Sequence, residues 1–151
     1  MRDTFRKIIL DTDVHDFGTL KEVVLMVLKD HADNGGGKIG YVAGIITSDG
    51  DEYMARNRLR LEQYTQEARE KVGFPIFSAT DIFTDDLYEK MKVHEMPRGD
   101  SEGLFQEFWR TILKSGYITN IYMTPRWEKS MGATDEHKSA LKVGLTITYL
   151  D

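Results

Sequence analysis

The chain has 151 residues, of which 40% are hydrophobic and 30% charged, and these proportions predict one globular domain, residues 1–151, with a single buried core. The net charge of −5 excludes the broad cationic surface that polymeric DNA or RNA requires, whereas a local pocket of backbone N–H groups can still bind one nucleotide. Because the chain has no cysteine, disulfides, thiolate zinc sites and thiol redox chemistry are excluded as well.

The first 37 residues are predicted to form an amino-terminal β-α extension. Residues 5–10 form a short run that favours a strand. Apolar residues at helical spacing over residues 19–31 predict a helix that ends at the three glycines of residues 35–37. The charged start leads into too few apolar residues for a signal sequence or a membrane span, so we expect a cytoplasmic protein that makes no membrane contact.

Strand and helix patterns alternate through the remaining core, residues 38–151. Strands are predicted at residues 39–46, 74–77, 117–123 and 145–150, and helices at residues 51–71, 101–114 and 134–143. Residues 78–81 are predicted to be an exit loop, and Pro97 and Gly99 predict an irregular connection over residues 87–98, a flap over a site. The alternation predicts an α/β fold, a three-layer α/β/α sandwich on a mostly parallel, Rossmann-like (flavodoxin-like) sheet. Ligands of such sheets gather at the carboxyl ends of the strands, which makes residues 44–51, 78–86 and 124–133 the candidate site loops.

The segment from Trp127 to Glu136 carries the most informative pattern. Ser130, Gly132 and Glu136 fall as S-x-G-x-x-x-E, and an earlier strand ends in Tyr-Val-Ala-Gly at residues 41–44. Both signatures resemble the nucleoside 2-deoxyribosyltransferase superfamily, most closely its small phage and bacterial nucleotide-acting members, over roughly residues 38–151. The resemblance implies a hydrolase or transferase that acts on the N-glycosidic bond of a nucleoside 5′-monophosphate. It also implies a homodimer or higher homo-oligomer in which the neighbour completes each pocket, and we expect no metal and no cofactor.

Glu136 is the candidate nucleophile. A carboxylate beneath the sugar stabilises the oxocarbenium-like state at C1′ and then captures it covalently. In the family a Tyr that matches Tyr41 orients this carboxylate through its hydroxyl. The alternative for Glu136 is an acidic residue that is merely favoured near the start of a helix. The alternative for Tyr41 is a core tyrosine whose hydroxyl forms its hydrogen bond elsewhere.

The substrate-binding candidates follow from the same resemblance. A Ser at the position of Ser130 contacts the 5′-phosphate in the nucleotide hydrolases, and capping of the following helix is a compatible role. Asp49 and Asp51 repel a phosphate, a charge that Arg56, Arg58 or Arg126 can offset. The residues expected to approach the nucleotide, through small size, free N–H groups or an aromatic ring, are Gly44, Ser48, Gly50, Trp127, Ser130, Gly132 and Ala133.

The general acid departs from the family pattern. Family members place an Asp about two dozen residues before the nucleophile, where this chain has Arg110 and Thr111. Glu107, on the same predicted helix, and Asp81, from the neighbouring loop, are the candidates for protonating the leaving base. The missing Asp also motivates the alternative function, a non-catalytic nucleotide-binding sensor or sponge.

The run Asp11-Thr12-Asp13, with Asp16, supports a rival hypothesis. It is similar to the opening of calcium-dependent nucleoside hydrolases, and clustered aspartates favour Ca²⁺ or Mg²⁺. The alternative is a polar turn in which Asp16 or Thr19 caps the next helix.

Overall fold

The computed structural model describes residues 1–94 and 101–151, and its four strands form one sheet in the order β2-β1-β3-β4. Every neighbouring pair of strands is parallel. The strands are β1 (Gly40–Ala43), β2 (Ile76–Ser78), β3 (Asn120–Met123) and β4 (Thr146–Tyr149). The helices are α1 (Arg2–Asp11), α2 (Phe17–Asn34), α3 (Met54–Lys71), α4 (Ala79–Ile82), α5 (Asp85–His94), α6 (Ser101–Leu113) and α7 (Met131–Val143), with short 3-10 helices η1 (Asp51–Tyr53) and η2 (Trp127–Lys129).

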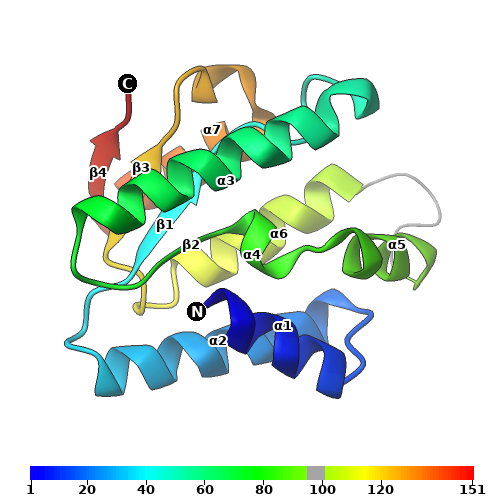
Figure 1. The fold of residues 1–151 in the computed structure, drawn as a ribbon, viewed down its shortest axis with the longest axis horizontal. Coiled ribbons are helices and arrows are strands. Elements are labelled where there is room, and N and C mark those ends of the chain that lie inside the picture. The colour runs from blue at the N-terminus through cyan, green and yellow to red at the C-terminus, as the bar shows by residue number, and fades with distance from the viewer. Residues whose placement is uncertain (95–100) are drawn as a thin grey trace.

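The predicted three-layer α/β/α arrangement on a parallel sheet is confirmed. Successive side chains of a strand point to opposite faces, so Tyr41 and Val42 of β1 enter different apolar clusters. The larger cluster lies between the sheet and helices that include α2, α6 and α7, and the smaller one lies under α3. Figure 1 shows α3 lying across one face of the sheet. Among the described helices, none combines the length and the hydropathy needed to cross a membrane.

The strand order creates a switch point beside the central strand β1. The chain leaves β1 for β2 on one side and then passes to β3 on the other side of β1. The loops that follow β1 and β3 therefore diverge, which leaves a crevice at the carboxyl ends of these strands, the usual place for a ligand in an open α/β sheet.

The prediction of a strand at residues 5–10 was wrong, because this segment lies within helix α1. Phe5 and Ile9, four residues apart, are both buried, whereas Leu10 is 67% exposed. The Phe5 ring lies 5.5 Å from the Phe77 ring of β2, so one helical face packs on the sheet. The amino-terminal extension is consequently a pair of helices, α1 and α2, rather than a β-α unit.

Asp16 caps α2, as the second interpretation of the aspartate-rich segment predicted. Its carboxylate accepts a hydrogen bond from the Thr19 N–H at 2.7 Å, and this bond lowers the pKa of Asp16. Within the described ranges, 1–94 and 101–151, no group of three or more His, Asp or Glu side chains is arranged to hold a metal ion.

Two segments predicted as irregular are helical. Residues 79–82 form α4 instead of a loop, because Ser78 and Asp81 cap its amino end reciprocally. Residues 87–94 belong to α5, and the rest of the predicted flap, residues 95–98, lies outside the residues that the structure describes, as does Gly99. Helix α7 begins at Met131, three residues before the predicted start, since Ser130 is its N-cap.

Candidate active site

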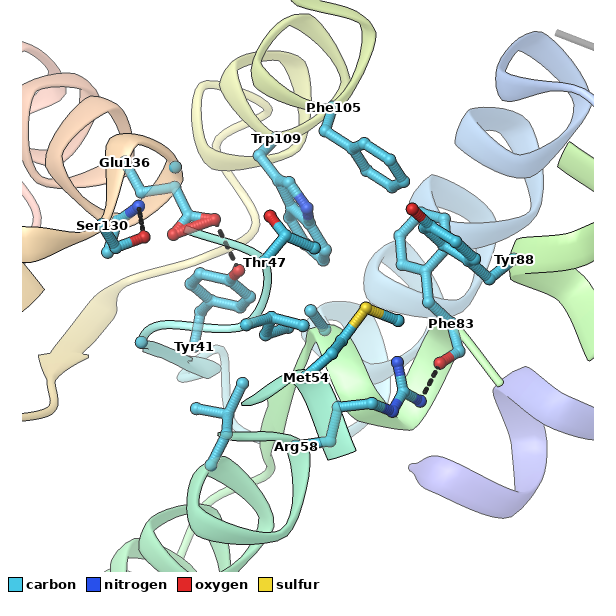
Figure 2. Close-up of a pocket in the computed structure, with 16 residues that line it drawn as sticks. Tyr41, Thr47, Met54, Arg58, Phe83, Tyr88, Phe105, Trp109, Ser130 and Glu136 are labelled. Atoms are coloured by element: carbon cyan, nitrogen blue, oxygen red, sulfur yellow. Dashed lines mark hydrogen bonds between the residues drawn. The ribbon is translucent and has the colours of Figure 1, made fainter. Parts of the chain in front are cut away.

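A cavity of about 90 Å³ lies at the switch point of the sheet. Gly44 follows β1, Ala79 follows β2, and Ser130 lies on the segment after β3, and all three line it. Figure 2 shows that the remaining labelled side chains converge on the same space from several helices. Of the residues expected to form the site, the cavity brings together Tyr41, Gly44, Ser130, Gly132, Ala133 and Glu136.

Glu136 and Tyr41 form the polar centre of the cavity. The Tyr41 hydroxyl, on the central strand β1, donates a 2.7 Å hydrogen bond to Glu136 Oε1 on α7. Their exposed fractions are only 2% for Tyr41 and 7% for Glu136. Burial raises the pKa of Tyr41 well above its ordinary value of 10.0, and the negative charge of Glu136 and its hydrogen bond raise it further. Across the physiological pH range Tyr41 is therefore a neutral donor whose hydroxyl orients the Glu136 side chain.

The amino end of α7 forms a second wall. Ser130 is buried, and its hydroxyl accepts a hydrogen bond from the Ala133 N–H at 3.1 Å, so the capping role predicted for this serine is confirmed. Ser48 lies outside the cavity lining, but its hydroxyl accepts from the Met131 N–H at 3.1 Å. This bond ties the loop after β1 to the start of the helix that carries Glu136.

Gly44 is the point where the chain leaves β1 and bends past its neighbours. A Cβ at this position would lie 2.5 Å from Thr124 Oγ1 and 3.2 Å from Leu61 Cδ1. Thr124 Oγ1 already donates a 3.0 Å hydrogen bond to the Ala43 carbonyl. Glycine therefore suits this close approach, a packing constraint that the sequence pattern did not indicate.

Aromatic side chains form the wall away from the carboxylate. Phe83 follows α4, and its ring lies 5.1 Å from the Phe105 ring and 6.2 Å from the Trp109 ring of α6. Tyr88 of α5 stacks on Phe105 at 6.1 Å, and Trp109 lies 4.7 Å from Tyr41. The result is an amphipathic cavity, with a carboxylate on one side and flat apolar surfaces on the other (Figure 2).

Cations of α3 and of the loop after β3 occupy different positions near this cavity. Arg58 lines the cavity with a side chain only 15% exposed, and its guanidinium donates to the Phe83 carbonyl. Arg56 and Arg126 instead approach the carboxylate of Asp49, at 3.8 and 3.9 Å. The charge of Asp49 is thus offset by two of the three arginines that the sequence offered, while the Arg58 guanidinium binds the Phe83 carbonyl and lies 3.9 Å from the Asp85 carboxylate at the cavity wall.

Four other predicted site residues lie outside the cavity lining. Asp81 is a fully buried residue of α4 whose carboxylate binds Arg2 and Arg69, and Glu107 is exposed on α6. Gly50 forms a turn, in which its N–H donates to the Thr47 carbonyl at 3.0 Å. Trp127 stacks on His137 at 4.2 Å on the surface of α7, so it contacts a helix rather than the cavity. Neither proposed general acid therefore touches the ligand space.

Arg110, one of the two residues found where the resemblance led us to expect an Asp, pairs with the residue next to Glu136. Arg110 donates to both carboxylate oxygens of Asp135, at 2.7 and 2.9 Å. The hydrogen bonds and charge of Asp135 raise the pKa of Arg110. This pair links α6 to α7 beside Glu136.

Sequence reasoning missed most of the aromatic wall. Phe105 and Trp109 are four residues apart on a helix, a spacing that is typical of any core-facing stripe and does not mark a ligand site. Ile46, Thr47, Ala79 and Phe83 lie in the predicted site loops 44–51 and 78–86 without having been singled out, whereas Met54, Leu61 and Tyr88 come from segments that were not predicted to reach the site. They converge from distant segments, which no local pattern reveals.

The fold and the site define an α/β protein with a parallel sheet and a carboxylate-bearing cavity at its switch point. Residues 39–149 match the family described as "Domain of unknown function (DUF4406)", and the chain belongs to that family. No curated protein and no solved structure matches the chain.

Proposed function

We propose that this protein cleaves or transfers the N-glycosidic bond of a nucleoside 5′-monophosphate through a covalent glycosyl-Glu136 intermediate. The observation that carries the proposal is the buried Glu136 carboxylate, which the Tyr41 hydroxyl orients at 2.7 Å in a cavity at the switch point of a parallel sheet. A poorly solvated, oriented carboxylate is well suited to stabilise a developing positive charge at an anomeric carbon.

The proposed reaction has two steps. In the first, a Glu136 carboxylate oxygen bonds to C1′ while the bond from C1′ to the base nitrogen breaks, and the base leaves with the bonding electrons and takes up a proton. In the second step, water attacks C1′, loses a proton and releases Glu136, which gives hydrolysis. A second base in place of water gives transfer. Tyr41 keeps its proton throughout and holds the carboxylate beneath the sugar.

In this proposal, the parts of such a substrate match the walls of the cavity. The sugar lies over Glu136, and the base lies against the aromatic wall of Phe83, Phe105 and Trp109, since flat rings stack on aromatic faces. A volume of about 90 Å³ holds only part of a nucleotide, so the phosphate extends outward, toward Ser130 at the start of α7 or toward Arg58. The family resemblance supports a homodimer whose partner closes the rest of the site, and light scattering tests this oligomeric state.

Incubation with a panel of nucleoside monophosphates, followed by chromatography for free base and for exchanged nucleotide, tests the proposal. Glu136→Gln removes the nucleophile and nearly preserves the shape, so product formation should fall at least about a thousandfold. Glu128→Gln is the matched control, because Glu128 is an exposed carboxylate on the neighbouring turn, and it should retain full activity. Release of no base from any nucleotide by the unaltered protein would refute the enzyme proposal.

A second candidate function is nucleotide binding without turnover. It is favoured by the positions of Asp81 and Glu107, since both expected proton donors lie away from the cavity. Calorimetry separates the two functions. Tight binding of a monophosphate that remains intact after prolonged incubation would support a sensor or sponge, and base release at a rate that depends on Glu136 would support the enzyme.

A further inference from the structure

Helix α1 precedes the region that matches the family, yet it reaches the wall of the cavity. Arg2 Nε donates a 2.6 Å hydrogen bond to Asp81 Oδ1, and Arg6 Nη2 donates a 2.9 Å bond to the Thr80 carbonyl. Both acceptors belong to α4, and Figure 1 shows α1 close to this short helix. Two cationic side chains of one helix therefore hold another helix that is distant in sequence.

Asp81 is the centre of this connection. Its carboxylate is completely buried, and in addition to Arg2 it accepts hydrogen bonds from Arg69 Nη2 of α3 at 2.8 Å and from the Ser78 N–H at 2.9 Å. The Ser78 bond is half of the reciprocal cap that starts α4. A helix of four residues is too short to be stable by itself, so external partners determine where α4 lies.

The position of α4 determines one wall of the cavity. Ala79 is its first residue and Phe83 is its C-cap, and both line the cavity. The Phe83 N–H donates to the Ala79 carbonyl at 2.8 Å, while the ring of Phe83 packs on Phe105. A shift of α4 would consequently move the aromatic surface on which a substrate base is proposed to stack.

We propose that Arg2 and Arg6 are positioning residues, which act through Asp81 and Thr80 to set the Ala79–Phe83 wall of the ligand cavity. The amino-terminal helix is then part of the site, although it lies outside the family match. The consequence for substrate rests on the proposed function. Loss of Arg2 should weaken substrate binding and raise KM, whereas kcat should change little, because Glu136 and Tyr41 are carried by α7 and β1.

Hydrogen exchange measured by mass spectrometry tests the structural claim without any substrate. Arg2→Gln should accelerate exchange at the Phe83 amide about tenfold, the effect of losing one hydrogen bond to a charged group, while the amides of β1 and α7 keep their rates. Arg2→Lys, which keeps a cation near Asp81, should restore part of the protection. Lys7→Gln is the matched control, because Lys7 is an exposed cation on the same helix, and it should change no rate.

Fluorescence provides a second measurement at the cavity itself. The chain has two tryptophans, so Trp127→Phe leaves Trp109 as the single reporter beside Phe83. In that background Arg2→Gln should increase quenching of Trp109 by acrylamide, and Lys7→Gln should not. Unchanged exchange at Phe83, or equal acceleration throughout the protein, would overturn the positioning role, since the second result indicates only a loss of global stability.

Turnover separates this inference from the proposed function. If the unaltered protein cleaves a nucleotide, a raised KM with a constant kcat in Arg2→Gln supports the inference, and a reduced kcat with a constant KM contradicts it. If no nucleotide is cleaved, the proposed function fails, and the exchange and quenching results still decide whether α1 sets the cavity wall.

Discussion

Replacement of Tyr41 by Phe removes one hydroxyl from the polar centre of the cavity and keeps the ring. The ring retains its packing against Phe77 at 5.3 Å and Trp109 at 4.7 Å, so the change is confined to the 2.7 Å bond to Glu136. A hydrogen bond to a charged acceptor contributes about 1.5–3 kcal/mol. At pH 7 the variant should therefore unfold with a free energy lower by about that amount, as measured by urea denaturation.

The same variant has a distinctive pH dependence. Burial and the charge of Glu136 raise the pKa of Tyr41 in the folded protein far above the value of 10.0 that applies after unfolding. Because the pKa is raised in the folded protein, the contribution of the Tyr41 hydroxyl to the free energy of unfolding is fully present below pH 10.0. Above pH 10.0 the unfolded chain loses the hydroxyl proton first, so the contribution decreases as the pH rises toward the folded pKa. The advantage of the unaltered protein over Tyr41→Phe should thus shrink by about 1.4 kcal/mol per pH unit above 10.

The control for this experiment is Tyr53→Phe, since Tyr53 is 40% exposed and its ring stacks on Arg56, a contact that phenylalanine preserves. This control should match the unaltered protein at pH 7. Two results would refute the reasoning about Tyr41. One is a stability difference below about 0.5 kcal/mol at pH 7, within the range of ordinary surface substitutions, and the other is a difference that stays constant up to pH 11.

Three further predictions concern the elements that support the site. Phe5→Ala should lower the free energy of unfolding by about 3–5 kcal/mol, since Phe5 is fully buried, whereas exposed Leu10→Ala should cost less than about 1 kcal/mol, as denaturant titration will show. Asp16→Ala should cost about 1 kcal/mol through loss of the α2 cap. Because the pKa of Asp16 is lowered in the folded protein, its contribution to the free energy of unfolding is fully present above pH 3.8 and is lost as the pH falls through the folded pKa. The difference between Asp16→Ala and the unaltered protein in urea denaturation should therefore be smaller at pH 3 than at pH 6. Asp81→Ala should lower the free energy of unfolding by about 3 kcal/mol. This value is near the lower end for breaking a buried ion pair, because Arg2 and Arg69 are partly exposed to solvent. A smaller decrease in melting temperature than that caused by Asp16→Ala would contradict this prediction.

The central strands β1 and β3 were predictable from the sequence because they are buried on both faces, whereas the edge strand β4 is largely exposed. Such strands are near-continuous apolar runs, and residues 39–46 and 117–123 are of this kind. The segment at residues 5–10 has the same β-branched residues and yet is helical, because Phe5 and Ile9 pack one helical face on the sheet. The local preference of residues for strand or helix does not reveal whether a segment will pack against another part of the protein.

The polar half of the site was predictable for a related reason. Ser130, Gly132 and Glu136 are close in sequence at the start of one helix, so a local pattern describes them. Glu107 was chosen by its position on the expected helix and Asp81 by its place in a loop expected to reach the site, but hydrogen bonds with Arg2 and Arg69 hold Asp81 away from the cavity. The aromatic wall combines residues of α4, α5 and α6 whose proximity depends on the three-dimensional arrangement.

The bend at Gly44 limits how this cavity can be redesigned. A methyl group there would lie 2.5 Å from Thr124 Oγ1 and 3.2 Å from Leu61 Cδ1, so the Thr124 side chain would have to leave its hydrogen bond with the Ala43 carbonyl and Leu61 would have to shift. Libraries that aim to change ligand preference should therefore keep residue 44 constant and diversify the rim, where Met54 and Tyr88 supply side chains from separate helices.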